Sequence, residues 1–477
     1  MIGLLSTVPL LLLAAPLALA GVAALLQRWT WAQAIVAALG MALLALIALQ
    51  APLDQAVVFL GRDVLFSSRW AVLGRVLVFA PGDRPALAFI FVLSTLLFAG
   101  SAAIKTPASF APVALVMLSL LMATLFVEPF LFAALFLVMT AAAGTVLLGA
   151  GGEGSTRGAM RWLAFVTMGA PFILLAGWQL EAYNASPTNP QLLEQARLLI
   201  MVGFVILLAV APFHSWVPAV AEQAPPFAAA FVFTVVQAAV LFYLLNFLDQ
   251  FEWMRTSAVV YQTFQVGGLA LVGVGGLFAI GQRNLGRLLG YSMLIDLGAT
   301  LLALSLNSPA GVQTAVALLA LRGLALATWG VGVGVLRARQ GGIGFDDLRG
   351  VAWKMPFATA AALLGGVSLL GLPVTAGFVG RWALYQLLAA ESLLAAVILL
   401  AANVGALLAY ARAATAMLAQ TKRGADEDDE LFGFAEGPLA MVYSGLGVGL
   451  VLVIGIFPQM LLPAVIAAAQ TFSRLMQ

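Results

Sequence analysis

The stretch APFHSWVPAVAEQAPPF, at residues 211–227, carries the chain's only histidine and places prolines and a glutamate between two long apolar runs. Because proline removes a backbone donor and interrupts helices, this stretch predicts a broken transmembrane helix. A second interruption, LLGLPVTAGFVGRW at residues 369–382, lies within another apolar run. Lipid cannot satisfy free backbone N–H and C=O groups, so each break must be buried in protein or line a hydrated cavity. Two matched breaks therefore predict a duplicated transporter whose function lies around them.

The composition indicates an all-α integral membrane protein. Of the 477 residues, 63% are hydrophobic and 9% are charged, and the mean hydropathy is +1.07. So little polar surface cannot cover a soluble globule. A window of about 20 residues gives about fourteen spans, near 3–27, 30–50, 84–104, 108–127, 129–150, 158–180, 193–217, 226–248, 257–281, 285–307, 311–336, 353–383, 386–419 and 437–462. The twelfth and thirteenth of these spans are long enough to be broken or strongly tilted.

The first residues, MIGLLSTVPLLLLAAPLALAG, have the apolar run and the A-L-A site of a signal peptide, but no Lys or Arg precedes Arg28. Since a signal peptide begins with a basic region, we interpret this segment as the first span. The chain has no cysteine, which excludes disulfides, thiolate metal sites and cysteine-bound iron–sulfur clusters. We expect no catalytic residue, metal site or cofactor-binding site, and no nucleic-acid partner. The sequence has no glycine-rich nucleotide motif outside the spans, which argues against a catalytic domain.

The basic residues predict the orientation in the membrane. Loops after odd-numbered spans hold 13 Lys and Arg residues, and loops after even-numbered spans hold six. The six are Arg62, Arg69, Arg75, Arg84, Arg197 and Arg255. The positive-inside rule places the odd loops in the cytoplasm and both termini outside. We therefore expect a chain integral to a bacterial or archaeal cytoplasmic membrane.

Three segments between the spans are polar. Residues 51–83 alternate apolar and charged positions and predict a short extracytoplasmic hairpin or amphipathic piece. Residues 337–354 carry a Gly pair at 341–342 and an Asp pair at 346–347, which suit a turn followed by a helix start. This segment is a plain connector or a lid. The run DEDDE at 426–430 is a solvated loop or docks to a basic partner subunit.

Five motifs occur in order: APFHSWVP, EQAPPFAAAF, QRNLGRLLGYSML, DDLRGVAWKMP and GLPVTAGFVGRW. Over residues 84–420 the chain closely resembles the antiporter-like, proton-translocating membrane subunits of respiratory complex I (NADH:quinone oxidoreductase). Related subunits occur in multi-subunit cation/proton antiporters and membrane-bound hydrogenases. The resemblance implies two inverted five-helix repeats, each with one broken helix, and partner membrane subunits. Flavin, iron–sulfur clusters and quinone would then belong to partners, with no redox chemistry in this chain.

The same resemblance divides the chain into four parts. Residues 1–107 hold the first three spans and the hairpin, and residues 108–250 form the first repeat. Residues 251–420 form the second repeat, and residues 421–477 hold the acidic loop and the last span.

The proton-carrying positions of the family are mostly replaced. In such subunits a buried glutamate on span five and lysines on spans seven and eight form one half-channel, and a lysine or glutamate on span twelve completes the other. Burial moves the pKa of such groups toward neutrality, so that each can pass a proton. Counting from His214 places Leu207 and Gln237 at the positions of the two lysines. Leucine carries no proton, and glutamine is polar without ionising.

The span-five acid has two candidate positions. Glu128 precedes Pro129, a pair that favours a turn and a new helix start at the proline. The resemblance then places Leu137 where the buried glutamate would be. If Glu128 instead lies one turn inside the membrane, it is the retained acid.

Asp296 lies in YSMLIDLGATL on span ten, where the family often has a histidine or lysine. A carboxylate at mid-membrane costs about 2.5 to 3.5 kcal/mol unless it is paired, so Asp296 predicts a cationic partner. Arg322 and Arg381 are the two basic residues well inside predicted spans. Arg381 matches the span-twelve position of the family, but arginine hardly ever releases a proton because its pKa exceeds about 12. The three residues are either a buried pair that fixes helix register or the remnant of an ion path.

His214 is either a structural histidine at the break or a proton relay. For the whole chain, three functions stay open. The first is a divergent ion-translocating subunit of a complex I-like assembly, coupled to quinone reduction. The second is a non-pumping membrane scaffold. The third is a subunit of a redox-free antiporter or of an inorganic-carbon uptake complex.

Overall fold

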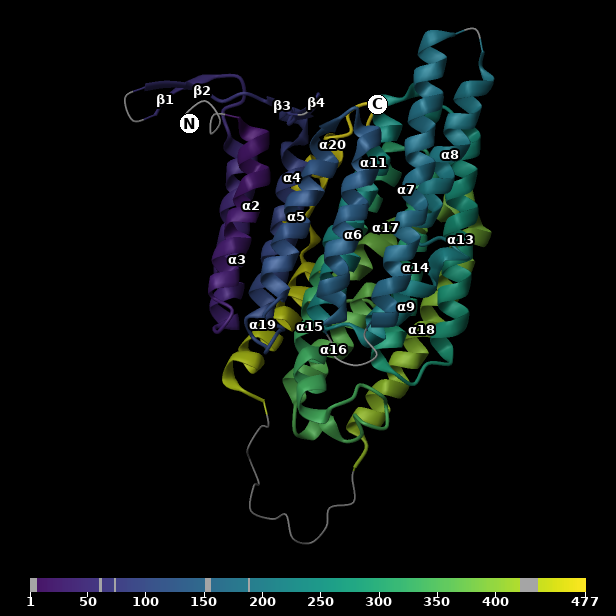
Figure 1. The fold of residues 1–477 in the computed structure, drawn as a ribbon. Helices are drawn as coiled ribbons and strands as arrows, with labels where there is room; N and C mark the ends of the chain where they lie inside the picture. Colours follow the sequence, from purple (N-terminus) through teal and green to yellow (C-terminus); the bar gives the residue numbers. More distant parts are fainter. Residues whose placement is uncertain (1–6, 60–61, 73, 151–155, 188, 421–435) are drawn as a thin grey trace.

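The computed structural model describes residues 7–59, 62–72, 74–150, 156–187, 189–420 and 436–477. Its helices run up and down in one bundle, and the start of α2 lies at the same end as the C terminus (Figure 1). The helices are α2 (Val8–Leu25), α3 (Thr30–Gln50), α4 (Arg84–Ser101), α5 (Phe110–Phe126), α6 (Ala133–Gly149), α7 (Thr156–Ala185), α8 (Gln191–Leu207), α9 (Trp216–Gln223), α10 (Pro226–Phe231), α11 (Gln237–Gln250), α12 (Glu252–Arg255), α13 (Ala258–Ile280), α14 (Leu285–Ser305), α15 (Pro309–Gln340), α16 (Pro356–Leu369), α17 (Ala376–Glu391), α18 (Leu393–Leu418), α19 (Pro438–Ile456) and α20 (Leu462–Gln470).

Shorter elements connect these helices. Five are 3-10 turns, at Pro81–Asp83, Phe130–Phe132, Phe213–Ser215, Val351–Trp353 and Pro458–Met460. A π-helical turn, η4 (Val232–Val236), joins α10 to α11. The strands are β1 (Ala56–Phe59), β2 (Arg62–Leu65), β3 (Arg69–Val72), β4 (Arg75–Val78) and β5 (Val127–Glu128).

Every predicted span coincides with a helix or with helices that a break separates. Within the described ranges, ten helices are long and apolar enough to cross a membrane, and α5, α6 and α16 are shorter apolar helices. The structure thus confirms an all-α membrane fold, whereas the number of crossings stays a prediction. Of the two long predicted spans, the twelfth is interrupted between α16 and α17, but the thirteenth forms the single helix α18 of 26 residues.

The region predicted as a hairpin contains two. Strands β1 and β2 pair antiparallel, as do β3 and β4, and β5 pairs with β4. The hairpins lie at the end of the bundle that also holds the C terminus (Figure 1). The Asp54 carboxylate accepts a hydrogen bond from Ser68 N at 3.0 Å, and this bond from the Ser68 backbone lowers the pKa of Asp54. The side of the membrane on which the hairpins lie stays a prediction.

The connector at residues 337–354 is the turn that the sequence predicts. Helix α15 ends at Gly341, whose φ of +74° is the left-handed conformation that glycine adopts at helix ends. The Asp347 carboxylate then accepts a hydrogen bond from Gly344 N at 3.0 Å. The turn at Val351–Trp353 and helix α16 follow. A lid function for this segment stays untested.

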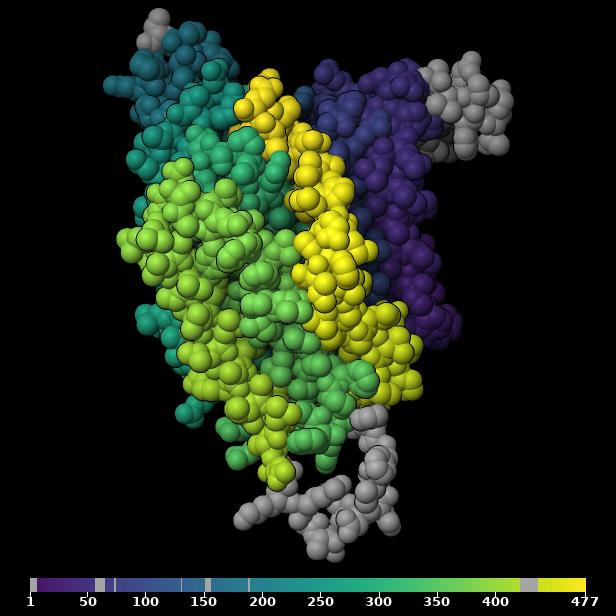
Figure 2. All heavy atoms as spheres, turned by 180° about the vertical axis from the view of Figure 1, so that it is seen from behind, coloured from purple at the N-terminus to yellow at the C-terminus, as the bar shows by residue number. Residues whose placement is uncertain are grey.

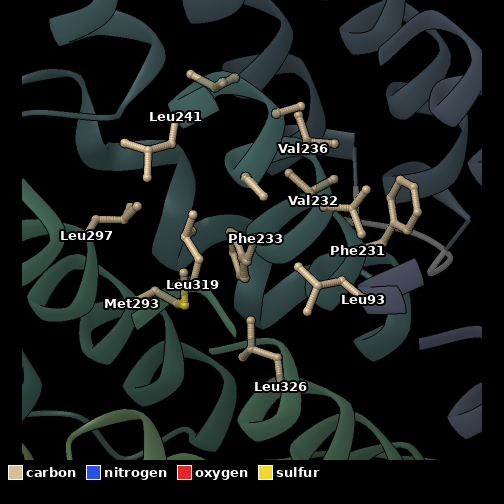
Figure 3. Close-up of a cluster of buried hydrophobic side chains, with 14 of the residues drawn as sticks. Leu93, Phe231, Val232, Phe233, Val236, Leu241, Met293, Leu297, Leu319 and Leu326 are labelled. Atoms are coloured by element: carbon tan, nitrogen blue, oxygen red, sulfur yellow. The ribbon is translucent and has the colours of Figure 1, made fainter. Parts of the chain in front are cut away.

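The middle of the bundle consists of α10, α11, α14 and α15, which are buried along almost their whole length. Helices α2, α3 and α19 lie at the periphery with many apolar side chains exposed. Figure 3 shows how Leu93, Phe233, Met293 and Leu319 come together from α4, η4, α14 and α15. These side chains belong to one continuous apolar core that joins the two halves of the chain.

The C-terminal segment crosses the back of the bundle. Figure 2 shows it between the first helices of the chain and the helices of the second half. Helix α19 contacts α15, α16 and α17, and α20 contacts α4 and α15. At its end, Arg474 N donates to Asp249 Oδ1 at 2.8 Å. The acidic run at 426–430 lies outside the described residues.

Candidate functional site

The first break divides predicted span seven. Helix α8 ends at Leu207, and regular α-helix resumes with α9 at Trp216. Between them, Ala209 has a φ of 56°, a left-handed conformation that is uncommon outside glycine. The carbonyl groups at the end of α8 accept hydrogen bonds from the next backbone N–H groups, those of residues 208–210. The first broken helix of the prediction is therefore present, and these backbone groups are satisfied within the protein.

The second break divides predicted span twelve between α16 and α17. Gly371 and Val374 have φ values of 78° and 73°, so this break, like the first, holds a non-glycine residue in the left-handed region. At the start of α17, Gly377 packs directly on Ser368, because an added Cβ would lie 1.7 Å from the Ser368 carbonyl oxygen. Ser368 Oγ also accepts a hydrogen bond from Gly377 N at 3.2 Å. Glycine is thus required where the two half-helices cross.

Asp296 forms two buried ion pairs at this second break. Its Oδ2 accepts from Arg322 Nε at 2.5 Å, and its Oδ1 accepts from Arg381 Nη2 at 2.9 Å. The three side chains are 0% to 3% exposed and come from α14, α15 and α17. The cationic partner predicted for Asp296 is therefore confirmed, and both candidate arginines serve.

Two further contacts fix the orientation of the arginines. Arg322 Nη2 donates to Thr300 Oγ1 at 3.0 Å, and this hydroxyl donates to the Asp296 carbonyl one helical turn back on α14. Arg381 Nη2 also donates to the carbonyl of Leu369, the last residue of α16, at 3.1 Å. Since the C-terminal end of a helix carries partial negative charge, α16 helps to hold the Arg381 cation.

The cluster carries more positive than negative charge. Two guanidinium groups face one carboxylate, and Arg322 Nη1 and Arg381 Nε and Nη1 have no hydrogen-bond partner among the described residues. Arginine stays protonated, so these groups set a local field and do not themselves relay protons. Asp296 supplies the one carboxylate among these three side chains.

Polar side chains continue beyond Arg381 toward α18. Tyr385 follows Arg381 by one helical turn on α17 and is half-buried. Its hydroxyl accepts a hydrogen bond from Asn403 Nδ2 at 2.7 Å. The Asn403 Oδ1 is buried without a hydrogen-bond partner in the described structure. Groups able to bind water or an ion therefore extend from Asp296 toward the outer helices of the second half.

On the other side, Arg322 lines a small cavity of about 10 Å³. Gln237 forms part of its wall at the start of α11, directly after the π-helical turn. The Gln237 Oε1 is buried and makes no hydrogen bond to a described residue. The remaining lining residues are Thr300 and five leucines, Leu208, Leu241, Leu297, Leu301 and Leu319.

The other predicted relay positions do not join this cluster. Leu137 on α6 and Leu207 at the end of α8 are buried apolar side chains. Glu128 lies in β5 between α5 and α6 and is exposed. His214 lies in the turn before α9 and is half-buried, with no partner for Nδ1 in the described chain. In the described structure, no hydrogen bond or ion pair joins His214 to Asp296, Arg322 or Arg381.

Sequence reasoning missed two residues of the site. Thr300 could have been found, because it lies four positions after Asp296 and hence on the same face of α14. Asn403 was visible as a lone amide within the apolar run ILLAANVGALLAY of α18. Its contact with Tyr385 could not be inferred, because the packing of α17 against α18 is set by the tertiary fold.

A family profile described as NADH:quinone oxidoreductase/Mrp antiporter, TM, matches residues 189–408, which span both breaks and the Asp296 cluster. The NADH-quinone oxidoreductase subunit N 1 of Solidesulfovibrio magneticus is 32% identical over 312 residues, covering 64% of this chain and 66% of that protein. The chain is thus similar to antiporter-like membrane subunits over this region. It is therefore an integral membrane protein, as predicted.

Solved structures agree with this family fold. A subunit of the archaeal membrane-bound sulfane sulfur reductase superposes with a TM-score of 0.79 at 20% identity, over 98% of each chain. A subunit of respiratory complex I from Thermus thermophilus gives a TM-score of 0.75 at 20% identity, over 100% of each chain. By contrast, the alignments to two curated subunit N relatives cover only 39% and 66% of their length. At 20% sequence identity, this structural similarity is evidence for the fold alone.

Proposed function

We propose that this chain is a membrane subunit of a complex I-like electron-transfer assembly, in which it carries a modified path for protons or another cation. Translocation is coupled to quinone reduction, and the flavin, iron–sulfur clusters and quinone are held by partner subunits. The family match over residues 189–408 and the likeness to subunits of multi-subunit membrane complexes support this proposal.

The observation that carries the proposal is the placement of Asp296, which is titratable and buried at the second break. An ionisable residue buried in a transmembrane segment is a candidate for an ion path, because its burial is costly. Here Arg381 and Arg322 flank Asp296 on two sides. Tyr385 and Asn403 continue the polar groups on one side, and Gln237 does so on the other.

The path is modified because the first repeat lacks its carriers. Leu137 and Leu207 are apolar and buried, and Gln237 does not ionise. A proton that reaches Asp296 therefore has no lysine relay to follow through the first repeat. Among the described residues, the buried charges that lie near a break, Asp296, Arg322 and Arg381, all belong to the second half of the chain.

Ion translocation by the purified parent assembly in liposomes tests the proposal. Wild type is compared with Asp296→Asn and Arg381→Ala at equal assembly yield. We expect a lower ratio of ions moved per electron in both variants. As a matched control, Arg287→Gln removes the ion pair with Glu222 near the surface, where Arg287 is 54% exposed, and should leave the ratio unchanged.

A second candidate function is a membrane scaffold that does not pump. The apolar filling between the two halves of the chain favours it, since Phe233 of η4, Met293 of α14 and Leu319 of α15 lie close together there (Figure 3). An unchanged ratio in Asp296→Asn, with the assembly intact and electron transfer normal, would establish the scaffold. Co-purification without any redox subunit would instead place the chain in a redox-free antiporter or an inorganic-carbon uptake complex.

A further inference from the structure

A second cavity lies at the end of the bundle that also holds the C terminus (Figure 1). Its volume of about 20 Å³ is enough for one particle of the size of a water molecule. Four segments meet around it: the start of α4, the end of α5, the last turns of α11 and the residues that follow α20. Its polar lining residues are Asp83, Asn246 and Thr471, and its apolar ones are Ala86, Leu87, Leu125, Phe126, Phe242 and Phe472.

Each of the three polar side chains offers an oxygen atom to the cavity. Asp83 Oδ2 accepts from Ala80 N at 2.8 Å, and no Arg or Lys among the described residues forms an ion pair with this carboxylate. Thr471 Oγ1 is buried with no hydrogen-bond partner in the described chain. Asn246 adds an amide oxygen, which accepts without ionising. Carboxylate, hydroxyl and amide oxygens are the ligands that hard cations prefer.

The charges around the cavity also favour a cation. Arg84 follows Asp83 in the chain but donates to the carbonyls of Leu49 and Ala51, at 3.2 and 2.6 Å. The exposed Glu128 carboxylate lies near enough to repel that of Asp83. Helices α5 and α20 both end at the cavity, and the C-terminal end of a helix carries partial negative charge. One carboxylate and two negative helix ends therefore face one positive helix end, that of α4.

We propose that this cavity binds one dehydrated monovalent cation, sodium under physiological conditions, as a structural ion. The single charge of Asp83 matches a monovalent cation, and the volume leaves no room for a hydrated or organic one. A water molecule in the same place would leave the half-buried Asp83 carboxylate without a counter-charge. The ion joins the C-terminal segment to α4, α5 and α11, whether or not the chain translocates ions. Its three ligands are far apart in the sequence, which led us to expect no metal site.

The test is the melting temperature of the full chain, purified with the subunits that accompany it. Sodium chloride is titrated against N-methylglucamine chloride at constant ionic strength and pH, so that only the cation changes. A ligand that binds only the folded state raises the melting temperature with its concentration. We expect a saturable rise with sodium and none with N-methylglucamine, which is too large for the cavity.

Two pairs of variants make the test specific. Asp83→Asn removes the charge but keeps an oxygen that can accept from Ala80 N, and it should abolish the sodium dependence. Asp346→Asn makes the same change at an exposed position in the connector after α15 and should retain the dependence. Thr471→Val should shift the half-maximal effect to a higher sodium concentration, whereas Thr256→Val, at an exposed position, should not. The threonine pair decides the test if Asp83→Asn does not fold.

Hydrogen exchange in the C-terminal segment provides a second readout. The backbone N–H groups of Arg474 and Leu475 donate to Asp249 Oδ1 at 2.8 and 3.2 Å, shortly after Thr471 in the chain. Sodium bound at Thr471 should slow the exchange of these amides in the wild type and not in Asp83→Asn. If sodium changes neither the melting temperature nor the exchange of the wild type, the cavity holds only water, which would overturn the proposal. An equal sodium dependence in Asp83→Asn and the exposed control Asp→Asn variant would overturn it as well.

Discussion

Arg322 Nε lies 2.5 Å from Asp296 Oδ2 in the interior of the bundle, although the two residues are 26 positions apart. The other oxygen of the same carboxylate binds Arg381, which is 85 positions from Asp296. One carboxylate thus connects three helices, α14, α15 and α17, at the point where the second broken helix is interrupted.

Asp296→Asn should destabilise the protein strongly. The substitution keeps the size of the side chain but leaves two buried guanidinium groups without a counter-charge, a change that costs about 3 to 5 kcal/mol. Thermal unfolding of the full chain in detergent should show a large drop in melting temperature. Glu194→Gln, which removes a pair whose carboxylate is 62% exposed, should change stability by less than about 1 kcal/mol.

Arg381→Lys should distinguish a field-setting cation from a proton carrier. Lysine keeps the positive charge but can release its proton, whereas arginine does not. If Asp296 lies on an active path, translocation by the variant should gain a pH dependence near neutrality that the wild type lacks. The measurement is proton uptake into liposomes across that range at a fixed electron-transfer rate. Identical pH profiles with normal assembly would contradict an active path at this position.

Gly371→Ala should cost more stability than Gly341→Ala. Both glycines have left-handed backbone, with φ values of 78° and 74°, so each alanine carries a similar strain of about 1 to 2 kcal/mol. A Cβ on Gly371 would also lie 2.4 Å from Arg381 Cγ, whereas one on Gly341 meets nothing within 4 Å. The difference between the two melting temperatures therefore reports the displacement of Arg381. Equal losses would show that the break tolerates the extra methyl group.

Glu436 should make the stability of α16 dependent on pH. Its Oε1 accepts a hydrogen bond from Ala358 N, in the first turn of α16, at 3.0 Å. Burial raises the pKa of Glu436 above its ordinary value, and hydrogen bonds from the Ala358 and Phe357 backbone partly offset the shift. The contribution of this group to stability is therefore complete below the unfolded pKa and is lost as pH rises through the folded pKa.

Glu436→Gln, which does not ionise, should match the wild type in acid and gain melting temperature relative to it as pH rises. Glu436→Ala removes the acceptor for Ala358 N–H and should lose about 1 kcal/mol in acid, where the wild-type contribution is complete. Hydrogen exchange in the first turn of α16 localises the effect. A wild-type minus Glu436→Gln difference that is flat with pH would contradict the raised pKa.

Single cysteines can test the predicted orientation directly, because the chain has no cysteine of its own. Arg339→Cys lies at the end of α15, and Thr256→Cys lies between α12 and α13; both positions are exposed. With both termini outside, an impermeant thiol reagent added to intact cells should label Thr256→Cys and spare Arg339→Cys. The reverse pattern would invert the topology.

The two breaks and the Asp296 pair could be predicted because each violates the pattern of an apolar span. Proline and glycine interrupt hydrogen bonding within a helix, and a lone carboxylate in hydrocarbon needs a cation. The use of both Arg322 and Arg381 could not be predicted, since it depends on how α14, α15 and α17 pack. Likewise, length alone does not tell a broken span from the continuous helix α18.

Other structural features, all contacts between distant segments, could not be predicted from the sequence patterns of the spans. The β3–β4–β5 sheet pairs residues around Val76 with Glu128, about 50 positions later in the chain. The hydrogen bond from Ala358 N to Glu436 joins segments that the acidic run separates. Contacts of this kind depend on the arrangement of the bundle, so they follow from the fold and not from local sequence patterns.

The leucine-rich filling of the first half has an electrical consequence. A dry region of low dielectric constant opposes the passage of any unaccompanied charge, because no dipoles replace the lost hydration. Leu137 and Leu207 are buried and apolar, so the surroundings of these two side chains oppose the passage of such a charge. If the proposed assembly stores an ion gradient, these buried leucines would keep that gradient from leaking through this part of the chain.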